Sequence, residues 1–242
     1  MGDGSSLCIP TTQSFMINST APPSFIWGVL LYDGFEVFDA FGPIETLNQL
    51  VRIRGYENQT MKIIAKDLKS VSSQDWKGRA KFGQSVVPTH TFKDPGPVDI
   101  VIVPGGKSMD PEGTEQAAKY LKDHFKEFKY VLTVCTGAGI AAESGILDNR
   151  RATTNKQGWK FMTPKGPKTT WIAEARWVVD GNIWSTSGVS AGTDGMLALL
   201  QAIYGSAIAD TIVVGMEYHR NSNGTPDPFA MINGAEDVKP SG

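Results

Sequence analysis

One of the two cysteines lies where a buried strand is expected to turn sharply into a helix. Residues 131–134 are aliphatic or β-branched, Cys135 follows them, and the small residues 136–139 open a helix-forming run. A side chain at such a turn projects from the carboxyl end of a sheet, so Cys135 is predicted to be a nucleophile. The positive end of the following helix would favour its thiolate form. The alternative is a buried, inert cysteine.

Two further segments are expected to end at the same sheet edge and to complete the chemistry. Asp39 follows the first apolar run, and Gly105-Gly106 follows residues 98–103. A carboxyl group beside a thiolate would have a raised pKa and could serve as general acid or base. The backbone amides of Gly105, Gly106 and Thr136 could form an oxyanion-type donor set, and the Thr136 hydroxyl adds a second polar group.

Each of these partners also has an ordinary structural explanation. Asp39 could be a helix cap or turn residue before Gly42-Pro43, and Gly105-Gly106 could be a plain tight turn. The three histidines are spread along the chain, so none is predicted to pair with the cysteine. No metal-ligand spacing or phosphate-binding loop is present, and we predict no metal and no cofactor.

Strand and helix patterns alternate along the chain, which predicts one α/β domain with a mostly parallel sheet. The expected strands are residues 25–32, 61–65, 98–103, 131–134 and 151–154, with a β-rich excursion at 71–87 and a hairpin joining 171–180 to 182–187. The first expected helix opens at Gly42-Pro43, and further helices are expected at 112–129, 140–144 and 188–204. Residues 211–218 are expected to form a helix or a strand. Residues 158–170 are expected to form a polar surface loop. Residues 1–24 are predicted to be a flexible arm, 25–220 the domain, and 221–242 an irregular tail.

Composition excludes several classes of protein. The 242 residues are 40% hydrophobic and carry a net charge of −2, which suits one sizeable core and argues against a nucleic-acid partner. Cys8 and Cys135 lie in unlike contexts, so no structural disulfide is expected and a reducing, cytoplasmic location is predicted. No apolar stretch reaches transmembrane length, and we expect no membrane partner.

The chain resembles the DJ-1/PfpI superfamily over roughly residues 25 to 220. The matching motifs are Asp39-x-x-Gly42-Pro43, Asp99-Ile-Val-Ile-Val-Pro-Gly-Gly106, Val134-Cys-Thr-Gly137, Ala141-x-Glu143-x-Gly145-x-Leu147-Asp148, Arg150-Arg-Ala-Thr-Thr154 and Ser187-Gly-Val-x-Ala-Gly-x-Asp194. The resemblance implies a flavodoxin-like three-layer α/β/α sandwich with a small β-hairpin excursion, and a homodimer. Within the superfamily, the Cys-Thr-Gly sequence with an aspartate before Gly-Pro is similar to isocyanide (isonitrile) hydratases, here in a fungal-type member.

This branch implies Cys135 as nucleophile, Asp39 as proton donor or base and Thr136 as the neighbour that tunes the site, with Gly42 and Asn155 among the substrate-binding positions. Relatives commonly carry histidine where Asn155 stands, and residues 156–168 look individual, so the substrate could differ from simple isonitriles. We therefore expect a hydratase or lyase acting on an isonitrile or a secondary-metabolite intermediate. The alternatives are a glyoxalase or deglycase activity on dicarbonyls and a non-enzymatic redox sensor.

Overall fold

The computed structural model describes residues 21–241. Most of the predicted N-terminal arm, and Cys8 with it, lies outside the described residues. The strands are β1 (Ile26–Leu30), β2 (Thr60–Ala65), β3 (Val71–Ser72), β4 (Ser85–Val86), β5 (His90–Thr91), β6 (Ile100–Val103), β7 (Tyr130–Thr133), β8 (Arg151–Ala152), β9 (Thr170–Trp171), β10 (Trp177–Asp180) and β11 (Ile183–Thr186). The helices are α1 (Val37–Leu50), α2 (Pro111–His124), α3 (Gly137–Glu143), α4 (Trp159–Met162), α5 (Ser190–Tyr204), α6 (Ser206–Gly215) and α7 (Pro228–Asn233), with short 3₁₀ turns at Phe125–Glu127 and Thr163–Lys165.

A seven-stranded sheet in the order β10-β11-β7-β6-β1-β2-β5 forms the centre of the molecule. Every neighbouring pair is parallel except β10 and β11, which form an antiparallel hairpin. All four residues of β6 are buried, as expected for a strand covered on both faces. The predicted mostly parallel sheet and flavodoxin-like α/β/α sandwich are confirmed.

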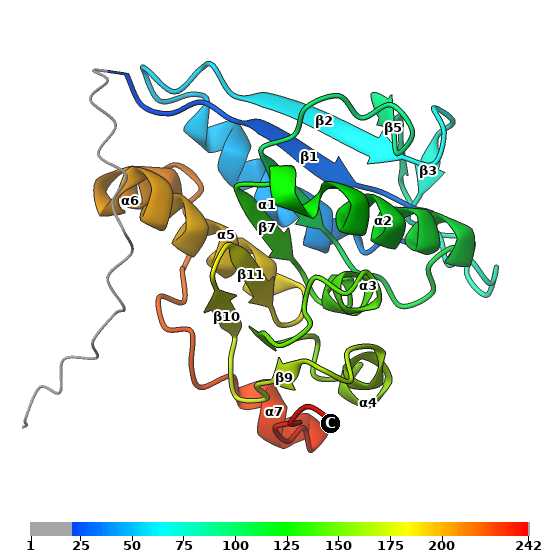
Figure 1. Ribbon diagram of the computed structural model, residues 1–242. Helices are drawn as coiled ribbons and strands as arrows, with labels where there is room; N and C mark the ends of the chain where they lie inside the picture. Colours follow the sequence, from blue (N-terminus) through cyan, green and yellow to red (C-terminus); the bar gives the residue numbers. More distant parts are fainter. Residues whose placement is uncertain (1–20, 242) are drawn as a thin grey trace, which may run out of the picture.

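Helices cover both faces of this sheet (Figure 1). On one face α5 packs against α1 and α6, and on the other α2 packs against α3. The predicted β excursion is the small antiparallel pair β3–β4. Because the parallel strands all point the same way, the loops after β1, β6 and β7 meet at one sheet edge.

The first helix begins earlier than the sequence predicted. Proline favours the first turn of a helix, which placed the expected start at Gly42-Pro43. Instead, α1 starts at Val37 and Pro43 lies inside it. Proline has no N–H to donate to the carbonyl of Asp39, four residues earlier, but burial of Ile44, Leu47 and Leu50 on one face compensates for that loss.

Residues 158–170 are not the exposed polar loop that was expected. They contain α4 and a 3₁₀ turn, and Trp159 is buried against Trp171 with ring centroids 6.3 Å apart. Trp171 belongs to β9, which pairs with β8, so the hairpin strand starts only at Trp177. The polar residues of this stretch masked the few large apolar side chains that fix its position.

The C-terminal segment contains more structure than the predicted irregular tail. It includes helix α7, and Val238 pairs with Trp171 through two backbone hydrogen bonds of 2.8 and 3.0 Å. The Trp159 indole N–H also donates to the carbonyl of Glu236 at 2.9 Å. Within residues 21–241, no helix combines the length and the apolar character needed to cross a membrane.

Candidate active site

Cys135 occupies a strained turn between β7 and α3. Its φ is +59°, a left-handed conformation that residues other than glycine adopt uncommonly. Two contacts hold this conformation: the Cys135 N–H donates to the Ser187 carbonyl at 3.0 Å, and the Thr154 hydroxyl donates to the Cys135 carbonyl at 2.9 Å. Such strain persists where the surroundings enforce it and is often found at functional sites. Cys135 is 6% exposed, so it is buried as the structural alternative expected, but its backbone is not that of an ordinary core residue.

Asp39 is fully buried in the first turn of α1, with Glu36 at the N-cap position. The alternative role of Asp39 as helix cap is therefore wrong. Its Oδ2 accepts the Gly105 N–H at 2.9 Å, whereas Oδ1 has no hydrogen-bond partner among the described residues. Burial raises the pKa of Asp39 to about 7; the Gly105 N–H opposes this shift, and the nearby Glu36 charge adds to it.

The Cys135 thiol and the Asp39 carboxyl act on each other's protonation. Burial, and then the negative charge of Asp39, raise the pKa of Cys135 well above its ordinary value. The backbone N–H groups of Val189 and Thr136 lower this pKa, but by less. The prediction that the start of α3 would favour thiolate is thus wrong for the resting site, because burial beside a carboxylate outweighs the backbone donors. The pair is suited to passing one proton between sulfur and oxygen.

The Gly105 and Gly106 amides are not free, contrary to the oxyanion prediction. The Gly105 N–H is bound to Asp39, and the Gly106 N–H donates to the Thr136 hydroxyl at 2.8 Å. That hydroxyl in turn donates to the Gly106 carbonyl at 3.0 Å. A Cβ on Gly105 would lie 2.4 Å from Thr136 Oγ1, so glycine is required by close approach of the two loops. These residues join the loops after β6 and β7.

Gly42 lies at the contact between α1 and α5. A Cβ built at this position would lie 2.5 Å from the Oγ1 of Thr193 on α5. Its assignment to substrate binding stays a prediction, while the packing role is direct.

Gly42→Ala is expected to lower the free energy of unfolding by about 1–3 kcal/mol, because the added methyl group overpacks the contact between α1 and α5. Denaturant unfolding measures this change. The double variant Gly42→Ala/Thr193→Ala removes the hydroxyl that the methyl group meets and should regain part of the loss. A single variant as stable as wild type would contradict the packing assignment.

Asn155 is half-buried at the border of the cysteine turn. Its Oδ1 accepts the Gly158 N–H at 2.8 Å, and a Cβ on Gly188 would lie 2.6 Å from its Nδ2. It therefore adjoins the turn that contains Val189, whose N–H faces the sulfur. Substrate contact by Asn155 remains a prediction.

Sequence reasoning missed three residues of the site. Tyr32 is buried, its hydroxyl donates to the Pro104 carbonyl, and burial together with the charges of Asp39 and Cys135 raises its pKa. Glu36 acts on Asp39 through its charge, and Val189 presents its amide to the sulfur. Position directly after a strand could have pointed to Tyr32, but nothing in the residue type of Val189 indicates a backbone donor.

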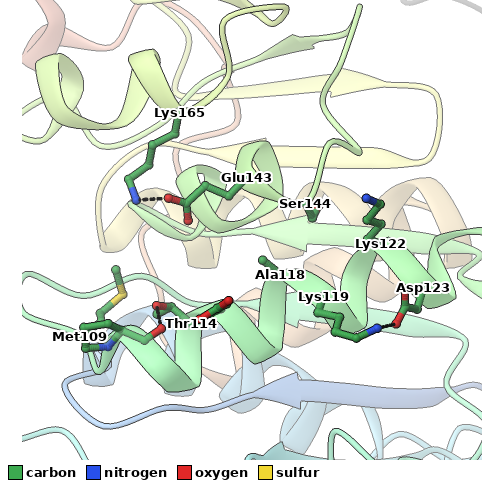
Figure 2. A pocket seen from close by; sticks show the side chains of 11 residues that line it. Met109, Thr114, Ala118, Lys119, Lys122, Asp123, Glu143, Ser144 and Lys165 are labelled. Carbon is green, nitrogen blue, oxygen red and sulfur yellow. Dashed lines mark hydrogen bonds and ion pairs between the residues drawn. The ribbon is translucent and has the colours of Figure 1, made fainter.

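An open depression on the described structure lies away from Cys135. Its volume is about 710 Å³, and it lies on the outer side of α2 and α3, where Figure 2 shows Lys165 paired with Glu143 and Lys119 paired with Asp123. Its lining includes none of Cys135, Asp39 or Val189. The strained cysteine, rather than the size of a depression, therefore identifies the candidate site.

None of the three histidines is among the groups whose charges or hydrogen bonds act on Cys135. His90 lies on the edge strand β5, His124 ends α2 beside Glu127, and His219 follows α6. Across residues 21–241, no group of three or more His, Cys, Asp or Glu side chains could hold a metal ion.

The combination of a mostly parallel sandwich with a cysteine turn after the inner strand β7 defines a class of proteins. The chain belongs to the DJ-1/PfpI family, whose model matches residues 28–202. It is 29% identical over 214 residues to the isonitrile hydratase of Pseudomonas putida, a match that covers 86% of this chain and 87% of that protein.

Other relatives have different described roles. The chain is 24% identical over 196 residues to the HTH-type transcriptional regulator GbdR of Pseudomonas aeruginosa, covering 81% of this chain but only about half (51%) of the regulator. Among solved structures, a ThiJ/PfpI family protein from Pseudomonas syringae matches with a TM-score of 0.68 and 25% identity, covering 88% of this chain and 83% of that one. The family thus includes proteins described as an enzyme and as regulators.

Proposed function

We propose that this protein is a cysteine-dependent hydratase that converts an isonitrile, or a related intermediate with a terminal electrophilic carbon, into an N-substituted formamide. The observation that carries the proposal is the buried pair of Cys135 and Asp39. Burial raises both pKa values; the Asp39 charge raises that of Cys135 further, whereas the hydrogen bond with Cys135 lowers that of Asp39. The similarity to the Pseudomonas putida isonitrile hydratase over most of both chains supports the substrate class.

In the first step the pair holds one proton between sulfur and oxygen. Asp39 takes the thiol proton as Cys135 attacks the terminal isonitrile carbon, forming a carbon–sulfur bond and converting the C≡N bond to C=N. The negative charge that develops on carbon then accepts the same proton from Asp39. A thioimidate results, and Asp39 is again a carboxylate.

In the second step water displaces the Cys135 sulfur from the substrate carbon. Asp39 takes a proton from water while the water oxygen adds to the thioimidate carbon. The thioimidate nitrogen then accepts that proton from Asp39. When the tetrahedral adduct collapses, the carbon–sulfur bond breaks, a carbonyl forms, and the hydroxyl proton returns to the Cys135–Asp39 pair. The Val189 and Thr136 amides stabilise the sulfur while it carries negative charge.

The geometry supports this chemistry better than the two alternatives from sequence. A peroxide sensor needs an exposed thiol of low pKa, whereas Cys135 is 6% exposed and its pKa is raised. A glyoxalase of this type would use a histidine by the cysteine, and Asn155 stands at the expected position. A cytoplasmic homodimer remains a prediction.

The match to GbdR favours a second candidate, a non-catalytic module that binds a small molecule. Such a module would keep the shape of the site without turning substrate over. The two candidates differ in whether product accumulates.

Incubating wild type with a panel of alkyl and aryl isonitriles should give the matching formamides, detected by mass spectrometry. Cys135→Ala should lower the rate at least about 10³-fold, since no other nucleophile replaces the sulfur. Asp123→Ala, which alters a carboxylate on α2, is the control and should keep full activity. If wild type binds an isonitrile without forming product, the hydratase proposal is wrong and the binding module is favoured.

A further inference from the structure

The turn that carries Val189 is held at both ends by one buried arginine. Arg176 lies directly before β10 and is 8% exposed. Its backbone carbonyl accepts the Ser187 N–H at 2.8 Å, and its Nη2 donates to the Ser190 hydroxyl at 3.2 Å. The four-residue turn from Ser187 to Ser190 is therefore fixed at its first and last residues from the same side.

Asp194 fixes Arg176 in turn. Its Oδ2 accepts from Arg176 Nε at 2.8 Å and from Nη2 at 2.7 Å, and the carboxylate is 1% exposed. The other oxygen accepts the Asn221 N–H at 3.1 Å. Two nitrogens of one guanidinium binding a single buried oxygen leave little freedom of rotation, a geometry that lysine cannot reproduce.

The turn requires such support because it is strained and adjoins the cysteine. Val189 has φ +32° and ψ −85°, which is costly for a β-branched residue. The Ser187 carbonyl accepts the Cys135 N–H at 3.0 Å, which joins this turn directly to the cysteine turn. A Cβ on Gly192 would lie 2.5 Å from Val134, so the first turn of α5 also packs closely on the residue before Cys135.

We propose that Arg176 and Asp194 are positioning residues that hold the Ser187–Ser190 turn so that the Val189 amide points at the Cys135 sulfur. Neither side chain touches the reacting atoms; they act through the backbone of the turn. The inference rests on the proposed function only because it takes the Cys135 sulfur to be the nucleophile. Asp39 and Tyr32 are the other groups that interact electrostatically with the thiol, and both stay unchanged in the variants that test the inference.

The test is the rate of Cys135 alkylation by iodoacetamide at fixed pH values from about pH 6 to about pH 9, where the rate follows the small fraction of thiolate. In Ser190→Ala and Asp194→Asn, the rate at each pH should fall about three- to tenfold, because the thiolate loses a fixed donor. Arg176→Lys should be as defective as Arg176→Met. Ser190→Thr, which keeps a hydroxyl at this position, should react at close to the wild-type rate.

A matched control is Arg150→Met, because Arg150 pairs with Asp180 at 3.3 Å at the tip of the β10–β11 hairpin, at the opposite edge of the sheet. It should lower the melting temperature without changing the alkylation rate. If Ser190→Ala and Asp194→Asn lower the melting temperature but are alkylated at the wild-type rate or faster, the pair is only structural and the inference is wrong. Alkylation needs no isonitrile, so failure of the hydratase assay leaves this test intact.

Discussion

Replacing Asp39 with asparagine is expected to lower kcat for isonitrile hydration by about 10²–10⁴-fold. An asparagine side chain can still accept the Gly105 N–H that Asp39 Oδ2 accepts at 2.9 Å. It cannot take the thiol proton or return it to carbon. Steady-state kinetics on wild type and Asp39→Asn measure the loss, and near-equal kcat values would remove Asp39 from the mechanism.

The wild-type rate should rise with pH through about 7, since the reactive pair has Asp39 ionised and burial raises its pKa to about 7. Asp39→Asn should lack this dependence. Glu36→Gln should keep it but move it to lower pH, because the Glu36 charge helps to raise the pKa of Asp39. A wild-type profile that is flat across this range would contradict the assignment of Asp39 as the base.

Asp39→Asn should also stabilise the fold at alkaline pH. The pKa of Asp39 is about 7 in the folded protein against 3.8 for the free side chain, so the folded state favours the protonated carboxyl. The contribution of the protonated Asp39 carboxyl to stability is fully present below about pH 3.8 and is lost as the pH rises through 7. At about pH 8, Asp39→Asn should therefore unfold with a free energy about 2–4 kcal/mol higher than wild type. At pH 4 the difference should largely vanish.

The second large effect is expected in the C-terminal segment. Replacing Asp227 with asparagine should cost about 3–5 kcal/mol, because it leaves the buried Lys156 ammonium without its counter-charge. Lys156 Nζ lies 3.6 Å from Asp227 Oδ2, and the two side chains are 1% and 0% exposed. The Thr153 hydroxyl at 2.7 Å and the Ala175 carbonyl at 2.9 Å solvate the ammonium but supply no full charge.

Urea unfolding compares this variant with Asp148→Asn, whose partner Lys168 is 61% exposed and whose loss should cost under about 1 kcal/mol. The double variant Lys156→Met/Asp227→Asn should be less destabilised than Asp227→Asn alone. Burial lowers the pKa of Lys156 to about 8, so the cost should shrink as pH rises past that value and the folded-state lysine becomes neutral. Equal losses of unfolding free energy in Asp227→Asn and Asp148→Asn would contradict the prediction that the buried pair contributes more than an exposed one.

The fold could be predicted because its central strands have a simple signal. Residues such as Ile102 and Leu132 belong to short apolar runs, which parallel strands covered on both faces require. The Asp-Gly turn at Asp180-Gly181 likewise marked the β10–β11 hairpin correctly. Where signals conflicted, prediction failed: the preference of proline for a first helical turn misplaced the start of α1, and polar neighbours hid the buried Trp159.

The site could be predicted only as a list of side chains. The positions of Cys135 and Asp39 after strands indicated that they would meet, since strand ends share an edge. That Gly105 and Gly106 already donate to Asp39 and Thr136 depends on loop conformation, which residue types do not encode. The role of the Val189 backbone N–H could not be predicted from the sequence either, because every residue except proline has one.

The pairing of Trp159 with Trp171 also gives the molecule an internal optical reporter. The Trp159 indole N–H donates to the Glu236 carbonyl, and the Lys156 ammonium lies 5.1 Å from the centre of the same indole ring. The backbone of Trp171 pairs with that of Val238. Tryptophan emission depends on the polarity around the ring. Detachment of the C-terminal segment would therefore change the emission of these two rings while the sheet stayed folded, and global unfolding would also change that of the tryptophans in the sheet, such as Trp27 and Trp184.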